Sequence, residues 1–282
     1  MNELLTESEA VLEGVRRLSR DLKKAAASMA DDEARYLVDL YYQMQDNRIR
    51  AAGQIRAMGE NYEPHSVIAH FQEQAEVLES TVKSALHEYI KPKPIGKWLL
   101  AQYGIGPVIA AGLVAHIDIH KAPAVGHIWN YAGLNPGVTW EKGQKRPWNS
   151  ELKTLCWNIG QSFMKFSNRD QCFYGKLYRE RKAFELERNE SGKLATNAGA
   201  ALAKKNYRRE TAAKACYEAG KLPPAHIDAM ARRWVVKLFL SHMHAVWFEA
   251  EFGKKAPEPY AMAHLGHVHK IDPPGPSVAE IA

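Results

Sequence analysis

Three amphipathic stretches in the first third of the sequence constrain the fold of this 282-residue chain more than any other feature. In 3–29, 32–58 and 66–90, apolar residues recur at steps of three, four and seven, as on one face of an α-helix. The stripe of the second stretch consists of Leu37, Tyr41, Met44, Ala51, Ile55 and Met58. No segment of the sequence shows the period-two alternation of a half-buried strand. We therefore predict an all-α protein that begins with a long helical hairpin or coiled coil.

The apolar stripes of this arm need a partner surface. Packing of the helices within one chain would cover them, and so would a seam with a second copy. A spacing close to 3.5 residues is typical of coiled coils, so we expect residues 1–90 to form an arm that dimerises. Intrachain packing is the alternative interpretation.

The segment KPKPIG at 91–96 ends the arm, because two prolines two residues apart cannot continue a helix. We expect a helical domain over 91–255, in which 139–149 is a connector and 189–199 a flexible insertion. Its helices are predicted at 97–103, 107–116, 125–131, 150–170, 171–189, 200–219 and 224–252. Residues 256–282 are rich in Pro and His, which predicts an extended or disordered tail.

Charge divides along the same boundary, although the whole chain carries only +6. Residues 1–90 have 10 Lys and Arg against 16 Asp and Glu, whereas 91–255 have 27 against 13. A basic segment beside an acidic one is typical of a polyanion-binding region joined to another module. A solvated basic surface is the simpler explanation of the charge alone.

The three cysteines show no CxxC spacing, and no apolar run approaches the ~20 residues that span a bilayer. The N-terminus lacks the pattern of a secretory signal. We therefore expect a cytoplasmic protein of a prokaryotic cell or its virus, associated with the nucleoid. We expect no membrane contact, no bound metal and no cofactor.

A Gly-Ile-Gly turn lies inside YGIGPVIAAGLVAHIDI at 103–119. Glycine permits positive φ and close backbone approach, and Pro107 suits the first turn of a helix. The amides of Gly104, Ile105 and Gly106 would then lie near a helix N-terminus, which attracts anions. A tight turn between two core helices explains a lone Gly-X-Gly as well.

The residues from GIGPVIAA to IWNYAGLNP, within 104–136, resemble the C-terminal part of the bridge-RNA-guided insertion-sequence transposases. Those enzymes carry a GIGP-x-x-A-A helix-hairpin-helix, then an aromatic-x-x-AGL-x-P segment. A looser similarity covers about 35–255, where the family has a helical arm for self-association at 32–90. The resemblance implies a domain that holds a DNA phosphate without reading bases, in a mobile element or recombination system.

The chain lacks the catalytic parts of that family pattern. The RNase-H-like nuclease domain has no counterpart, because four candidate aspartates lie in a helical pattern: Asp31, Asp32, Asp39 and Asp46. The family's Ser-Gly step after AGL-x-P reads Lys142-Gly143 here. The nearest serine, Ser150, suits a helix N-cap, with Asn149 as the other candidate. We therefore expect no catalytic residue.

Clustered lysines and arginines of the basic segment are candidate phosphate contacts. They are Lys142, Lys145, Arg146, Arg179, Arg181, Lys182, Lys204, Lys205, Arg208 and Arg209. The aromatic residues between them suit stacking on bases, and they are Trp140, Trp148, Tyr178 and Tyr207. For Trp140 and Trp148, packing in a small core over the connector is the favoured explanation. His242 and His244 lack the i, i+4 spacing of a zinc site and are expected at the surface. His264, His267 and His269 belong to the predicted tail.

The sequence thus predicts a non-catalytic DNA-binding protein that contacts the phosphate backbone, with structured RNA as a second candidate ligand. It would act as a homodimer, with a separate nuclease as a further candidate partner. Two alternatives stay open. One is a transposase or recombinase with a displaced nucleophile, and the other is a mobile-element protein-interaction module, an inhibitor or adaptor.

Overall fold

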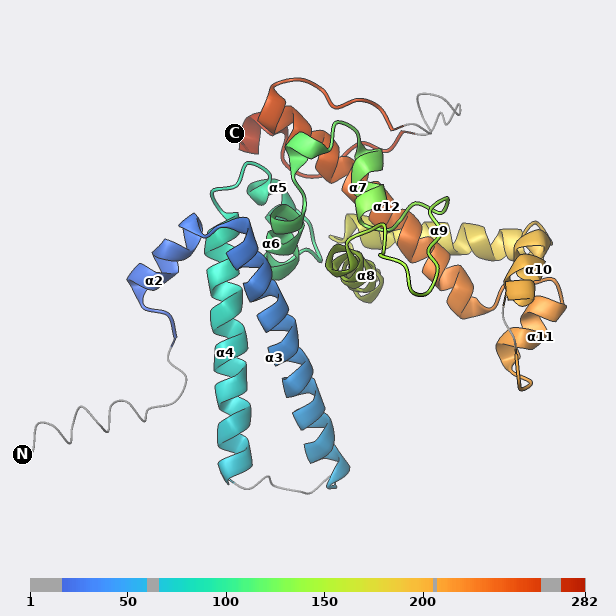
Figure 1. Ribbon diagram of the computed structural model, residues 1–282, viewed down its shortest axis with the longest axis horizontal. Helices are drawn as coiled ribbons and strands as arrows, with labels where there is room; N and C mark the ends of the chain where they lie inside the picture. The colour runs from blue at the N-terminus through green and yellow to red at the C-terminus, as the bar shows by residue number, and fades with distance from the viewer. Residues whose placement is uncertain (1–16, 60–65, 205–206, 260–269, 282) are drawn as a thin grey trace, which may run out of the picture. The chain divides into compact units, whose positions relative to one another are not determined.

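The computed structural model describes residues 17–59, 66–204, 207–259 and 270–281. Within these ranges the chain forms helices and no strand, which confirms the all-α class (Figure 1). The helices are α2 (Arg20–Ala25), η1 (Ala26–Ser28), α3 (Asp31–Ala57), α4 (Ser66–Ile90), α5 (Gly96–Ala101), α6 (Pro107–His116), η2 (Ile119–Lys121), α7 (Val125–Tyr131), α8 (Ser150–Lys165), α9 (Phe173–Glu190), α10 (Ala195–Lys204), α11 (Ala212–Glu218), α12 (Pro224–Phe252) and α14 (Val278–Ile281). None of these described helices is long and apolar enough to cross a membrane.

The chain divides into two compact units. The first unit comprises Met1–Lys97 and Gly106–Asp118, and the second comprises Trp98–Ile105 and Ile119–Ala282. This division differs from the expected boundary at residue 90, because α6 belongs with the arm. The chain therefore passes between the units three times.

The composition of α6 explains its place in the first unit. Its sequence, PVIAAGLVAH, is apolar on all sides, and a helix of this kind is stable only when neighbours surround it. The helix packs against both α3 and α4, which bury Val38 and Leu86 in this part of the unit. Arg35 of α3 donates from Nη1 to the carbonyl oxygen of Ala115, 2.5 Å away. The arm is therefore a three-helix unit at one end and a two-helix pair at the other.

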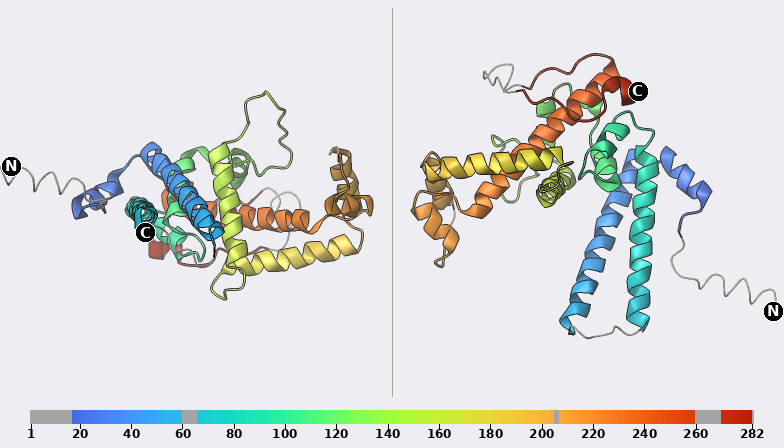
Figure 2. Two further views of the ribbon diagram at one scale, coloured as in Figure 1. Left: turned by 90° about the horizontal axis from the view of Figure 1, so that it is seen from below. Right: turned by 180° about the vertical axis from the view of Figure 1, so that it is seen from behind.

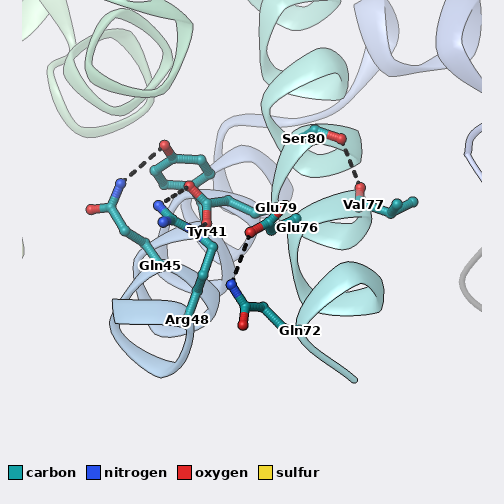
Figure 3. Close-up of polar contacts among 8 residues, drawn as sticks. All are labelled: Tyr41, Gln45, Arg48, Gln72, Glu76, Val77, Glu79 and Ser80. Carbon is teal, nitrogen blue, oxygen red and sulfur yellow. Dashed lines mark hydrogen bonds and ion pairs between the residues drawn. The ribbon is translucent and has the colours of Figure 1, made fainter. Parts of the chain in front are cut away.

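The distal half of the α3–α4 pair is joined by polar contacts (Figure 3). Arg48 donates through Nε and Nη2 to the two carboxylate oxygens of Glu79, at 2.6 and 3.2 Å. Burial, and secondarily the charge of Glu79, raise the pKa of Tyr41 to about 12. No residue in 39–57 or 66–81 is fully buried, and stripe residues such as Met44 and Leu78 are half-buried. Packing within one chain therefore covers the apolar stripe only in part.

Helix α12 organises the second unit, with α7, α8 and α9 packed against it (Figures 1 and 2). An aromatic cluster forms the core. The ring of Phe239 lies 5.9 Å from that of Trp98 and 5.2 Å from that of Tyr174, and Phe163 stacks on Tyr174 at 4.9 Å. Trp98 belongs to α5, so this core explains why the chain enters the second unit at that residue.

The segment expected as a flexible insertion at 189–199 is a tight turn followed by α10, which corrects that prediction. Gly192 has φ +75° and ends α9. Buried Asn189 donates to the carbonyl oxygen of Leu222 and accepts from its amide, at 3.0 and 2.8 Å. The single helix expected over 200–219 is two helices, α10 and α11, which bury Ala198 and Tyr217 in a small core.

The C-terminal segment 256–282 is described at 256–259 and 270–281, and before Val278 these residues have no regular secondary structure, which fits the expected extended chain. Residues 270–281 also pack against the second unit, which the sequence did not predict. The carbonyl oxygen of Pro274 accepts hydrogen bonds from Trp98 Nε1 and Gln102 Nε2, at 2.8 and 3.3 Å. Helix α14 follows at Val278–Ile281. Residues around Pro274 are therefore held by hydrogen bonds from the side chains of Trp98 in α5 and the adjoining Gln102 to a backbone carbonyl. His264 and its neighbours at 260–269 lie outside the described residues.

His242 and His244 are buried, not at the surface as expected. His242 is bonded through Nδ1 to the Tyr174 hydroxyl at 2.9 Å and through Nε2 to the carbonyl oxygen of Ile271 at 2.7 Å. His244 Nε2 lies 2.8 Å from the carbonyl oxygen of Ala122. Their apolar surroundings on α12 made burial predictable, because polar groups in a core are tolerated when they are hydrogen-bonded.

Candidate nucleic-acid interface

The first glycine of the Gly-Ile-Gly turn is required by the fold. Gly104 has φ +94°, and its carbonyl oxygen accepts a hydrogen bond from Ser162 Oγ at 2.6 Å. A Cβ at this position would lie 3.1 Å from the same Oγ. Both the backbone conformation and the close approach to α8 therefore favour glycine.

Ile105 and Gly106 differ in whether their backbone amides could reach a phosphate. Ile105 is buried, and its amide already donates to the carbonyl oxygen of Gln102 at 2.9 Å. Gly106, in the first unit, is the N-cap of α6 with φ −92°, and a Cβ there would meet nothing within 4 Å. One of the three expected phosphate donors is thus used within the turn, and Gly106 keeps open space beside it.

The AGLNP segment forms the turn after α7. Gly133 has φ +63°; its amide donates to Asn130 at 3.0 Å, and the amide of Leu134 donates to Trp129 at 2.8 Å. These two bonds define a Schellman motif, in which a left-handed glycine ends the helix. The Asn135 side chain accepts from the amide of Gly137 at 2.9 Å. The motif residues AGLNP therefore fix a rigid turn.

Gly133 also admits two side chains of the second unit. A Cβ at this position would lie 2.8 Å from Cγ of Trp148 and 3.1 Å from Cδ of Lys153.

Asn149 is the N-cap of α8, because its Oδ1 accepts from the amide of Leu152 at 2.8 Å. The predicted cap, Ser150, is instead the first helical residue.

A pocket of about 400 Å³ lies between the 133–136 turn and helices α8 and α12. The two helices approach closely at Gly160, where a Cβ would lie 3.3 Å from Val236. Leu134, Cys156 and Val236 supply an apolar lining. The thiol of Cys156 is no nucleophile, since burial raises its pKa to about 12.

Positive charge concentrates at this pocket, with Lys153, Arg232 and Arg233 in its lining. Burial lowers the pKa of the Lys153 ammonium, and the charges of Arg233 and Arg146 lower it further. Burial and Arg233 likewise lower the pKa of Lys237. Arg232 differs, because its Nε donates to Asp228 at 2.7 Å. Arginine charges that lower the pKa of neighbouring lysine ammonium groups favour an incoming anion.

Indole rings accompany these cations. Lys153 Nζ lies 3.9 Å from the ring centroid of Trp148, and Lys237 Nζ lies 4.2 Å from that of Trp129. Trp157 also lines the pocket, and its side chain is 59% exposed. The pocket therefore combines ammonium and guanidinium groups with one accessible aromatic face.

The sequence prediction missed Lys153, Trp157, Arg232 and Arg233. A signal for Trp157 existed, because it falls outside the buried stripe of α8 and follows Lys153 by four residues on the same helix face. The arginines lie in ARRW, on a helix that looked purely structural. Their approach to the AGLNP turn depends on tertiary packing, which no local pattern encodes.

The predicted basic residues fall into different environments. In the connector, Lys142, Lys145 and Arg146 are exposed, and Arg146 lies 5.3 Å from the Trp140 ring. This connector is the loop between α7 and α8 (Figure 2). The charge of Arg146 acts on Lys153, so the structure joins part of the connector to the pocket.

On α9, two of the predicted contacts already have acidic partners. Arg181 pairs with buried Glu185, and Lys182 lies 3.0 Å from Asp228. Arg179 is exposed and makes a long contact of 3.5 Å to Asn168. The remaining exposed candidates are Lys204, Arg208 and Arg209, whereas Lys205 lies outside the described residues.

Comparison with known proteins does not extend the resemblance found in the sequence. No protein-family model, no curated protein and no solved structure matches the chain. The transposase resemblance therefore stays a prediction carried by the residues of 104–136 themselves.

Proposed function

We propose that this chain is a non-catalytic DNA-binding protein of a mobile element or recombination system. It acts in the cytoplasm, at the nucleoid, and holds the phosphate backbone through its second unit. The observation that carries the proposal is the group of cations at the pocket beside the AGLNP turn, where the Lys153 pKa is lowered. A phosphate oxygen bound there would relieve the repulsion among Lys153, Arg233 and Arg146.

The proposed footprint is narrower than the predicted one. It includes the pocket cations Lys153 and Arg233 and the exposed connector cations Lys142, Lys145 and Arg146. It leaves out Arg181 and Lys182, since breaking their ion pairs with Glu185 and Asp228 would offset the gain from a phosphate.

Strand cleavage is assigned to a separate nuclease in this proposal. At the position where the resembled family has Ser-Gly, the chain has Lys142-Gly143, in an exposed loop with Gly143 at φ +95°. A lysine side chain there can contact a phosphate but cannot replace a serine nucleophile in this chemistry.

The test of binding is a salt series with a labelled 20-base-pair duplex, read by fluorescence anisotropy. We expect log Kd to vary linearly with log salt concentration, with a slope set by the number of phosphates contacted. The double variant Lys153→Gln/Arg233→Gln should bind at least about tenfold more weakly and lower the slope by about two.

The control removes the same charge from the first unit, in Lys83→Gln/Arg50→Gln, both exposed. This control should bind like the unaltered protein. Equal weakening of the two double variants would show a general effect of net charge and refute the proposed site. Absence of salt-dependent binding to duplex DNA, with binding to structured RNA instead, would replace DNA by RNA as the ligand.

The amide of Gly106, at the N-terminus of α6 in the first unit, is a second proposed contact and is tested by substitution at that residue. Gly106→Val should fold normally, because the position has an ordinary φ and open space. Gly104→Val is unsuitable, since the fold itself needs that glycine. Undiminished duplex binding by folded Gly106→Val would reduce the Gly-Ile-Gly segment to a structural turn.

We propose, in addition, that the first unit joins two copies through the distal half of α3 and α4. The apolar stripe residues of this half are only partly covered within one chain. Two further apolar side chains, Ile49 and Phe71, are 51% and 69% exposed. A second helical pair would cover these side chains and complete the core that the single pair leaves partial.

A further inference from the structure

The pocket has a shape and lining that a contact to backbone phosphate does not require. A duplex backbone is met by cations on a flat or convex surface, whereas this pocket is a concavity of about 400 Å³ with apolar walls. Volumes of this order are typical of sites that enclose part of a small organic group. The apolar walls, formed by Leu134, Cys156 and Val236, therefore need an explanation beyond phosphate binding.

Trp157 supplies a second feature that duplex backbone would leave unused. Its indole is 59% exposed at the pocket, although the helix buries Leu155 and Ile159 on its other side. Lys153 lies four residues earlier, one helical turn away on the same face. A cation and an aromatic face one helical turn apart, both lining the same pocket, can contact the phosphate and the base of one nucleotide.

We propose that the pocket receives one unpaired nucleotide, with its phosphate at Lys153 and Arg233 and its base stacked on Trp157. This inference rests on the proposed function and specifies its substrate as nucleic acid with an unpaired segment. A base inside a duplex is stacked on its neighbours and cannot offer its face to an indole, whereas a base in a gap or single strand can.

The test compares three labelled DNAs of equal length: a duplex, a duplex with a central four-nucleotide gap, and a single strand. Each is titrated with the unaltered chain and with Trp157→Ala, Trp157→Phe and the control Trp140→Ala. Trp140 is a second exposed indole of the same unit and does not line the pocket. A single-stranded RNA of the same base sequence forms a fourth arm.

We expect the gapped DNA to bind about fivefold or more tightly than the duplex, as stacking of one base predicts. Trp157→Ala should abolish this preference and leave duplex affinity unchanged, while Trp157→Phe retains part of it and Trp140→Ala all of it. Trp157-dependent binding of RNA also supports the proposal and shows by relative affinity which polymer the pocket prefers.

Failure of the inference and failure of the proposed function give different results. Equal affinity of the unaltered chain for gapped and duplex DNA would overturn the nucleotide pocket and keep backbone binding. The same conclusion would follow if Trp157→Ala weakened binding to both DNAs equally, or if Trp140→Ala removed the preference for the gap as Trp157→Ala does. Absence of binding to every nucleic acid would overturn both. If Trp157→Ala fails to fold, Trp157→Phe compared on gapped and duplex DNA provides the same test, since it should lose part of the preference for the gap.

Discussion

Gly133 shows how one residue combines a backbone and a packing requirement. Its positive φ ends α7, and the absence of a Cβ admits Trp148 and Lys153 against the turn. The sequence predicted the turn from AGLNPG, because glycine and proline mark turns directly. It could not predict that a tryptophan 15 positions later would occupy the space that glycine leaves.

Gly133→Ala should therefore lower the free energy of unfolding by about 2–4 kcal/mol, from left-handed strain plus overpacking. Gly192→Ala is the matched control, since Gly192 has φ +75° and no atom within 4 Å of a Cβ. It should cost only about 1–2 kcal/mol. Urea denaturation measures both, and equal losses would show that the Trp148 contact does not matter.

The buried imidazole of His242 makes stability depend on pH. Burial lowers its pKa to about 4, against a normal value near 6.5. Between those values the unfolded chain binds a proton that the folded chain does not, so stability falls as the pH falls. The contribution of neutral His242 to the free energy of unfolding is fully present above pH 6.5. Near pH 4, about 3 kcal/mol of it is lost.

Urea denaturation at pH 7.5 and pH 5 measures this dependence. His242→Gln should be less stable at pH 7.5 and show a smaller decrease between the two pH values. His87, His116 and His244, whose pKa values burial also lowers, remain in the variant and contribute to the residual slope. An unchanged pH dependence in His242→Gln would contradict the assignment.

At the scale of elements, the N-cap of α8 gives a direct comparison of two neighbouring residues. Asn149→Ala removes the bond to the Leu152 amide and should destabilise the protein by about 1–2 kcal/mol. Ser150→Ala, at the first helical position, should change stability by less than about 0.5 kcal/mol. Thermal unfolding of the two variants checks this, and the reverse order would make Ser150 the cap.

The sequence predicted most helices because their evidence is local. The bounds of α4, α6, α7 and α12 follow from apolar periodicity, from Pro107 and Pro224 at helix starts, and from breakers such as Gly133. The turn at 191–194 and the packed tail were missed, because Asn189 and Pro274 acquire their partners from distant segments. Polar composition predicts disorder only where such partners are lacking.

The sequence did not predict that α6 belongs to the first unit, for a related reason. Its sequence shows that it must be buried, but not by which helices. Heptad spacing in the arm likewise predicts an apolar seam without stating whether the partner helix comes from the same chain. The pocket at AGLNP, α8 and α12 needs three segments from different parts of the sequence, and only the first carried a recognisable motif.

For the whole molecule, the proposed dimer is tested by light scattering coupled to size exclusion. The chain should elute with twice the mass of one copy, and Ile49→Glu/Phe71→Glu should yield monomers with unchanged helix content. Leu186→Glu, an exposed apolar residue of the second unit, is the control and should stay dimeric. Two results would contradict dimerisation through the arm. One is a monomeric unaltered chain, and the other is a dimer that persists in Ile49→Glu/Phe71→Glu.

Hydrogen exchange with and without duplex DNA tests the central claim most directly, because it locates bound DNA on the chain. At low salt, DNA should slow exchange of the 133–137 turn, of the first two turns of α8 and of 229–236 in α12. The protection should disappear at high salt, as the release of counterions requires. Protection confined to α3 and α4, or to α10 and α11, while the duplex remains bound would contradict the assignment of the interface to this pocket.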